Sequence, residues 1–281
     1  MDNPDGWQID AGLAIPYLQE LGWTVDWVPW RTLAVDWTDY DVVYLGVAWD
    51  YPQDPDGFLD TLRQIDAAGA RLLNSLPTAQ WNINKQYLRD LQERGVDIVP
   101  SAWFDNVRAF ELSAILEMFA ADRVVVKPVI GTNAIDSFVI TRDNWDARGQ
   151  AVRANFSNRA FVVQPFIDAV QSEGEYSLFF IGGKYSHAIR KKPVVGDYRV
   201  QEEYGASLES VKPEPALLRA AEHSVAAVDP VPLYARSDFV RSADNRFLLM
   251  ELELIEPSMY LRLDDAAPER FARAFDVFAS A

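Results

Sequence analysis

The residues that most clearly suggest chemistry are two acidic side chains near the carboxyl-terminal end of the chain. Glu251 and Glu253 lie two positions apart in residues 247–255, where β-favouring apolar residues predict a strand. Because side chains alternate along a strand, both carboxylates point to the same face. Burying a bare carboxylate is costly, so this strand needs a positively charged partner.

A third acidic residue joins them through a predicted hairpin. Residues 234–240 form another expected strand, and Asp244-Asn245 favours a two-residue turn between the two strands. Counting back from this turn places Asp238 directly opposite Glu251. Three carboxylates are therefore expected on one face, although like charges directly opposed destabilise a sheet.

Two interpretations of this acidic cluster are open. A set of oxygen ligands suits a hard cation such as magnesium, which makes Asp238, Glu251 and Glu253 a candidate metal site. Alternatively, Arg236 and Arg262 are near enough in the sequence to neutralise the cluster. The rest of the chain bears on this choice.

The composition narrows the classes of function. The chain has 281 residues, no cysteine, two histidines and a formal net charge of −16. The absence of cysteine excludes disulfides, a thiol nucleophile and cysteine-held zinc, and two histidines disfavour a multi-histidine metal site. The acidic balance argues against binding to nucleic acid or to an anionic membrane. No stretch reads as a membrane span or a signal peptide, so we expect a cytoplasmic protein.

The elements that must position these residues begin with an α/β unit. Strands alternate with a helix in the first 81 residues, which predicts a mostly parallel sheet. The expected elements are strands at 24–28, 41–46 and 71–73 and a helix at 55–68. Ligands of such sheets gather beyond the carboxyl ends of the strands. Asp50 and Tyr51 follow the second strand and are candidate substrate contacts, with loop packing as the alternative.

Two lysines mark the next unit, which begins near residue 82. Lys85 opens a helix that runs to Arg94, and Lys127 lies in an apolar strand before a small, polar loop, Gly131–Asn133. Lysine is rarely buried unless it is paired. Lys127 either extends its charge to the surface or holds an anion beside this loop, whose backbone NH groups suit phosphate.

A basic hairpin follows. Residues 175–181 alternate cleanly, two glycines favour a tight turn, and residues 184–192 return. The returning strand carries His187 and Arg190, and the turn-rich segment beyond it ends in Arg199. Basic residues concentrated in so acidic a chain indicate an anion site; a solvated edge strand is the alternative.

The order of these features resembles the ATP-grasp superfamily across nearly the whole chain. Gly196-Asp-Tyr-Arg199 is similar to the glycine–aspartate–phenylalanine–arginine run of ribosomal-protein glutamate ligases. Glu251-Leu-Glu253 resembles the metal strand of prokaryotic glutathione synthetase, where asparagine usually stands at the second position. The segments that resemble the cycloserine-forming O-ureidoserine cyclo-ligases are Trp49–Tyr51, Ser186–Ala188, Lys192-Pro193 and Gln201–Gly205. Those enzymes tend to carry an arginine where this chain has Gly46–Ala48.

The resemblance implies an α/β (α+β) chain with the ATP-grasp fold, in which two subdomains clasp ATP. It divides the chain into an amino-terminal α/β domain and two ATP-grasp subdomains, with bounds 1–81, 82–163 and 164–281. The residues implied to bind ATP are Lys85, Lys127, Gln164, Pro165, Phe166, Ile167, Asp168 and Glu175. Those implied to hold one or two magnesium ions, or manganese, are Asp238, Glu251 and Glu253.

The implied activity is an ATP-dependent ligase that activates a carboxylate as an acyl phosphate for attack by an amine. The residues implied to stabilise the acyl phosphate are Arg199 and Arg190. The residues expected to contact a small amino-acid-like substrate are Asp50, Tyr51, His187 and Ser258. The alternatives are an ATP-grasp kinase or phosphotransferase and a non-catalytic nucleotide-binding regulator. ATP and a small molecule are the expected partners, and a homodimer is left open.

Overall fold

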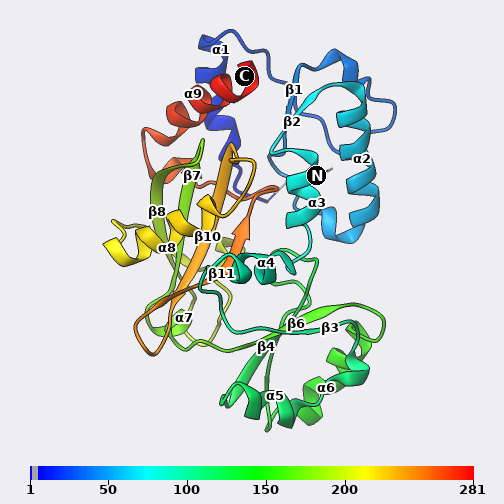
Figure 1. Cartoon of the computed structure of the whole chain (residues 1–281), viewed down its shortest axis with the longest axis vertical. Coiled ribbons are helices and arrows are strands. Elements are labelled where there is room, and N and C mark those ends of the chain that lie inside the picture. The colour runs from blue at the N-terminus through cyan, green and yellow to red at the C-terminus, as the bar shows by residue number, and fades with distance from the viewer. Residues whose placement is uncertain (2–5) are drawn as a thin grey trace.

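The computed structural model describes Met1 and residues 6–281. Three β-sheets organise this part of the chain: one of two strands, one of four and one of five. In Figure 1 the four-stranded sheet and its helices form the lower part of the molecule. The five-stranded sheet lies above it on the left, and the amino-terminal sheet lies at the upper right.

The smallest sheet is parallel, as the alternation of strands and helix predicts. β1 (Val42–Tyr44) pairs with β2 (Arg71–Leu73), and α2 (Pro55–Ala68) makes the crossover between them. α2 begins where the Asp54 side chain accepts a hydrogen bond from the backbone, and it ends at Gly69 with φ 87°. These are typical start and stop signals, which is why the predicted bounds are confirmed. The other helices of this part are α1 (Ile15–Glu20) and α3 (Leu76–Asn82).

The prediction of a strand at residues 24–28 is wrong. This segment has no regular secondary structure, and Thr24 and Asp26 are exposed. Val25 packs against the cluster built around α9 (Ala267–Ser280) instead of a sheet. Within the described residues β1 pairs only with β2, so the segment has no strand beside it to pair with.

The four-stranded sheet is antiparallel, in the order β3-β6-β4-β5. Its strands are β3 (Ala102–Phe104), β4 (Arg123–Pro128), β5 (Phe138–Thr141) and β6 (Phe161–Pro165). The helices α5 (Leu112–Met118) and α6 (Trp145–Asn155) contribute to the hydrophobic core on one of its faces. A separate 3-10 turn at Val107–Ala109 precedes α5.

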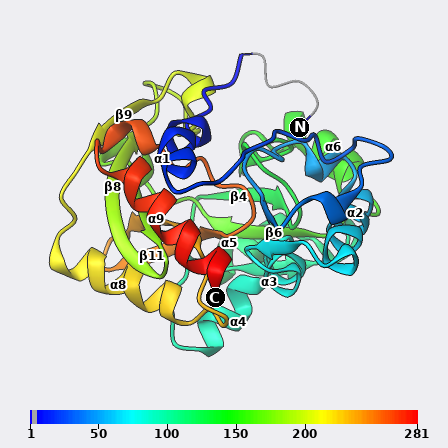
Figure 2. The same ribbon diagram turned by 90° about the horizontal axis from the view of Figure 1, so that it is seen from above.

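The five-stranded sheet is also antiparallel, in the order β11-β10-β7-β8-β9. Its strands are β7 (Glu175–Ile181), β8 (Lys184–Lys192), β9 (Ser207–Ser210), β10 (Tyr234–Arg241) and β11 (Phe247–Glu253). The helices around it are α4 (Tyr87–Glu93), α7 (Ala169–Ser172), α8 (Pro215–Ala226) and α9. Figure 2 shows α9 alongside α1, and the two helices are in contact.

The two faces of the five-stranded sheet differ in polarity. One face is apolar and packs on α4 and α8, with Leu178 and Phe239 in its core. The opposite face is apolar under α9, where Phe179 and Tyr234 are buried, and again near α7, where Val240 is buried. Further along the same strands this face becomes polar, which leaves a strip of charged side chains directed toward the four-stranded sheet.

The β10–β11 hairpin contains two departures from the predicted register that cancel. Ser242 pairs with Arg246, so the loop has three residues and not two. The resulting offset of one residue persists until Phe239, which pairs with Leu249. A β-bulge at Met250 then restores the predicted pairing of Asp238 with Glu251. The bulge also explains why Leu249 lies in the core while the side chain two positions later faces the polar strip.

We propose to keep the three predicted units with one boundary moved. The predicted boundary between residues 163 and 164 falls inside β6, which belongs to the four-stranded sheet. Placing that boundary after Ile167 keeps the sheet whole. No helix in the described part of the chain is long and apolar enough to cross a membrane.

Candidate active site

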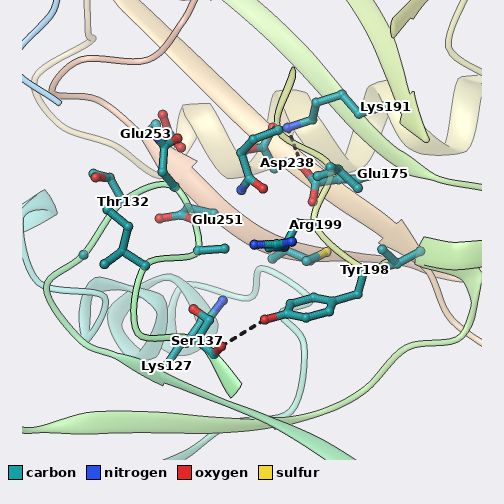
Figure 3. Close-up of a pocket in the computed structure, with 18 of the residues that line it drawn as sticks. Lys127, Thr132, Ser137, Glu175, Lys191, Tyr198, Arg199, Asp238, Glu251 and Glu253 are labelled. Atoms are coloured by element: carbon teal, nitrogen blue, oxygen red, sulfur yellow. Dashed lines mark hydrogen bonds and ion pairs between the residues drawn. The ribbon is translucent and has the colours of Figure 1, made fainter. Parts of the chain in front are cut away.

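A cavity lies between the four-stranded and five-stranded sheets (Figure 3). Along β4, Val124 and Val126 are buried against α5 and α6, whereas Val125 and Lys127 line the cavity from the opposite face. The other wall is the polar strip of the five-stranded sheet. The strip contains Glu175, Lys191, Arg236, Asp238, Glu251 and Glu253. In Figure 3 Lys127 faces the carboxylates of this strip.

The structure brings most of the predicted site residues together. Those that line the cavity are Lys85, Lys127, Gln164, Pro165, Phe166, Ile167, Glu175, Arg199, Asp238, Glu251, Glu253 and Ser258. Those that do not are Asp50, Tyr51, Asp168, His187 and Arg190.

The two predicted lysines have different surroundings. Lys85 Nζ lies 2.6 Å from the carbonyl oxygen of Gly131 and 2.9 Å from Glu251 Oε1. Among the described residues, the ammonium group of Lys127 has no hydrogen bond or ion pair. Burial lowers the pKa of Lys127 and nearby Lys85 lowers it further, whereas Glu251 acts in the opposite direction. An unpaired ammonium in a buried position favours the binding of an anion over snorkelling.

The three carboxylates of the predicted metal site are each paired with a protein cation. Arg236 bridges Asp238, at 3.0 Å, and Glu253, which lies directly opposite it on β11. Burial opposes the ionisation of Asp238, but Arg236 and Lys191 outweigh it and hold the pKa of Asp238 below its usual value. Burial raises the pKa of Glu253 to about 7 despite Arg236.

These pairs bear directly on the two interpretations of the acidic cluster. Arg236 neutralises it as the structural interpretation expects, whereas Arg262 pairs with Asp10 and Glu202. Among the described side chains, no three acidic or histidine groups lie close enough together to form a ready metal site. The donor set nevertheless fits magnesium chemically, because all of its atoms are carboxylate oxygens facing one cavity.

The residues Gln164–Ile167, which are implied to bind ATP, span the end of β6. The Gln164 side chain donates to Ser101 Oγ at 2.9 Å, and the ring of Phe166 lies under the guanidinium of Arg123, 3.9 Å from its centroid. Asp168 is drawn to the outer surface by Arg123, at 2.5 Å, which explains why it does not line the cavity. Of the two acidic residues implied to bind ATP, only Glu175 lines the cavity.

Two loops close one side of the cavity. Tyr198 donates a hydrogen bond to the carbonyl oxygen of Ser137 at 3.0 Å, and Tyr204 donates to that of Asn133 at 3.2 Å. Asn133 has a left-handed backbone, with φ 52°. Arg199 lies between these contacts, bound to Asp197 Oδ2 at 2.7 Å and stacked on Tyr204 at 3.8 Å. Its hydrogen bonds hold the pKa of Asp197 at about 2.

The register of β8 turns Arg190, which was predicted to stabilise the acyl phosphate, away from the cavity. It lies opposite Tyr176 and pairs with Glu209 at 2.7 Å, on the face turned away from the cavity. The neighbouring residue, Lys191, lies opposite Glu175 and faces the cavity, where its ammonium is 2.5 Å from that carboxylate. The alternation of the strand would have identified Lys191, once Glu175 was placed inside.

The predicted substrate contacts near the amino-terminal sheet also lie elsewhere. Asp50 accepts a hydrogen bond from the indole of Trp30 and pairs with Arg31. Tyr51 is buried and stacks on Phe58. Both serve the packing of this domain, which was the alternative interpretation.

His187 is a structural residue as well. Its ring stacks on Phe179, and its Nε2 lies 3.0 Å from the carbonyl oxygen of Met259. Burial lowers the pKa of His187 to about 4. The segment after β11 is therefore tied to β8, and this tie helps to position Ser258 at the cavity.

Comparisons with known proteins confirm the ATP-grasp resemblance. The profile of the family described as D-cycloserine synthetase DcsG, N-terminal domain, matches residues 1–74. The cycloserine biosynthesis protein DcsG of Streptomyces lavendulae is 28% identical over 269 residues, covering 90% of this chain and 88% of that protein. The crystal structure of D-cycloserine synthetase DcsG has a TM-score of 0.84 at 25% identity, covering 96% of this chain and 94% of the other.

A more distant likeness extends to another ligase. The structure of the ATP-grasp ligase PsnB with a minimal precursor variant, Mg and ADP has a TM-score of 0.64 at 16% identity, covering 96% of this chain and 94% of the other. This likeness bears on the fold alone. The chain therefore has the ATP-grasp fold, and the predicted similarity to cycloserine-forming ligases is confirmed.

Proposed function

We propose that this ATP-dependent ligase of the ATP-grasp fold phosphorylates the carboxylate of a small amino-acid-like substrate. An amine of the same or a second molecule then displaces the phosphate, which closes a ring or forms an amide. The observation that carries the proposal is the cavity between the two sheets, where the Lys127 ammonium, which has no partner among the described residues, faces three carboxylates. Similarity to D-cycloserine synthetase over nearly the whole chain supports it.

The nucleotide would be held mainly by residues of the four-stranded sheet. Lys127 and Lys85 would contact the phosphates, because a lysine in an apolar strand is best explained by an anionic partner. The adenine would lie against the segment Gln164–Ile167, and Glu175 would accept hydrogen bonds from the ribose.

Magnesium would be held by Asp238, Glu251 and Glu253, whose oxygens all face the cavity. When bound, it would neutralise charge on the transferring phosphoryl group. Glu253 stands where glutathione synthetase usually has asparagine. Because Arg236 pairs with Glu253, this glutamate adds no net charge to the site.

Arg199 would stabilise the phosphate that is transferred to the substrate carboxylate. Its planar guanidinium can meet two oxygens at once. Asp197 and Tyr204 hold it in place on the loop, so the charge is already oriented toward the cavity before the reaction.

The test is a screen for ADP release with ATP, magnesium, O-ureidoserine of either configuration, and small amino acids paired with amine acceptors. The expected result is release of ADP and phosphate in equal amounts, dependent on the carboxylic acid. A phosphorylated product without free phosphate would instead indicate a kinase. ATP binding without any acid-dependent ADP release would indicate a non-catalytic nucleotide-binding protein.

A further inference from the structure

One acidic side chain of the cavity has no part in the chemistry above. Glu256 follows β11, is 5% exposed and lines the cavity. Its carboxyl has no hydrogen bond or ion pair with any residue that the structure describes. Burial raises the pKa of Glu256 well above its usual value, and neighbouring Glu253 adds to this. Burying an acidic group without a donor is costly, so its site is built for a ligand that supplies one.

Two tryptophans of the cavity are linked to this position. The indole NH of Trp49 donates to the backbone carbonyl of Glu256 at 2.8 Å, which fixes the ring beside it. Trp49 in turn contacts Trp7, with ring centroids 5.1 Å apart, and both rings line the cavity. A second acceptor in the same cavity, Gln201 Oε1, is buried and has no donor among the described residues.

The cavity groups that have no partner within the described part of the chain thus fall into two kinds. Lys127 is a cation without an anion, which suits phosphate. Glu256 and Gln201 are acceptors without donors, which suit a group rich in N–H bonds. The Glu256 site differs from one for a divalent metal ion, which requires several oxygen ligands. An ammonium group, in contrast, is well served by one carboxylate and nearby aromatic faces.

We propose that Glu256, beside Trp49 and Trp7, binds the ammonium group of the amino-acid-like substrate. This inference rests on the proposed function for the substrate class, and it identifies Glu256 as a specificity-determining residue. The carboxylate would orient the substrate so that the acid group to be phosphorylated faces the nucleotide. Its loss would therefore weaken substrate binding far more than it slows turnover.

The experiment is calorimetry with matched pairs of probes that differ only in the amino group. The pairs are cycloserine with isoxazolidin-3-one, serine with 3-hydroxypropionate, and alanine with propionate, each titrated with and without magnesium and ADP. For the wild type we expect at least one amino compound to bind ~10- to 100-fold more tightly than its partner, the scale of a hydrogen bond to a charged group.

The variant Glu256→Gln is expected to lose this preference, so that both members of the pair bind about equally. Its melting temperature should stay the same or rise, because glutamine fills the site without a buried acid. Affinity for ADP and the magnesium dependence of ADP binding should be unchanged. Glu222→Gln, at an exposed position of α8, is the matched control and should keep the wild-type preference.

Three results would overturn the inference. They are a wild type that binds none of the amino compounds, a variant that keeps the full preference, and a variant whose ADP binding becomes less dependent on magnesium. The last would make Glu256 a metal ligand. Because these titrations involve no turnover, they can succeed or fail independently of the ADP-release screen.

Discussion

Lys85 and Lys127 show how two buried lysines in one cavity can differ. Lys85 is held by Glu251 and a backbone carbonyl, so its charge is already balanced. Lys127 has neither kind of partner among the described residues, and burial lowers its pKa. The structure therefore stores an unfavourable charge at Lys127, which an anionic ligand would stabilise.

The first prediction follows from this difference. Lys127→Met should keep or raise the melting temperature, because methionine fills a similar volume without a buried charge, and should weaken ATP binding ~10-fold or more. Lys184→Met, at an exposed position at the start of β8, is the control and should bind ATP normally. A sharp fall in melting temperature with unchanged ATP affinity would show that Lys127 is structural.

The second prediction concerns Arg199. Arg199→Ala should leave ATP affinity nearly intact while turnover falls ~10²-fold or more, the effect of removing one preorganised donor at the transferring group. Arg199→Lys should recover little, because a point charge lacks the planar fork. Arg246→Ala, which removes an exposed arginine of the β10–β11 hairpin, should be silent. Steady-state ADP release and ATP titration measure both quantities, and loss of ATP binding in proportion to turnover would contradict the assignment.

The sequence indicated which segments contribute to this site, but it did not indicate which of two neighbouring residues faces the cavity. Arg190 and Lys191 are adjacent and both basic, and only the pairing of β8 with β7 decides that Lys191 points inward. Glu256 was missed because it lies beyond the end of β11, directly before Pro257, where the alternation of a strand no longer applies. Asp50 does follow a strand, as predicted. Its carboxylate, however, is bound by Trp30 and Arg31, which lie about 20 residues earlier in the chain and were not predicted to contact it.

At the scale of the elements, the β10–β11 hairpin shows how a correct pairing can rest on an incorrect turn. The loop has one residue more than predicted, and the bulge at Met250 compensates for it. A β-bulge has no clear sequence signal, so it could not be predicted. The acidic residues could be identified because carboxylates are unusual in an apolar strand. Helix α2 was predicted correctly because its capping residues are local, and the strand at 24–28 was not, because pairing depends on a distant neighbour.

The third prediction concerns the link between β8 and the segment after β11. His187 has a pKa of about 4 in the folded protein, against about 6.5 when unfolded. The unfolded state therefore takes up a proton first, and stability is lost as the pH falls from about 6.5 to about 4. The loss reaches about 3 kcal/mol at the lower end.

Urea unfolding of the wild type and His187→Gln between pH 7 and pH 4 measures this contribution. The variant should be less stable at pH 7 but should lose less of its stability on acidification. His223→Gln, at an exposed position of α8, should follow the wild-type pH dependence. Equal pH dependence in the wild type and the His187 variant would contradict the prediction.

At the scale of the whole molecule, charge governs how the nucleotide binds. The chain has a net charge of −16, which repels the triphosphate of ATP. Four of its carboxylates lie on the cavity wall formed by the five-stranded sheet, and they belong to Glu175, Asp238, Glu251 and Glu253. The fourth prediction is that ATP binding requires a divalent cation, because Lys85, Lys191 and Arg236 are already paired with these carboxylates and leave little positive charge for the triphosphate. Calorimetry with magnesium and with a chelator tests this, and equal affinity in both would rule out the proposed metal ligands.

The central claim is that the molecule transfers phosphate to a carboxylate, and isotope transfer tests it most directly. The substrate that supports ADP release is labelled with ¹⁸O in its carboxyl group, and the inorganic phosphate is collected after turnover. An acyl phosphate intermediate predicts that one labelled oxygen appears in the phosphate, because the carboxylate oxygen that attacks ATP leaves with it. Unlabelled phosphate, with all the label retained in the product or the unreacted acid, would contradict the account.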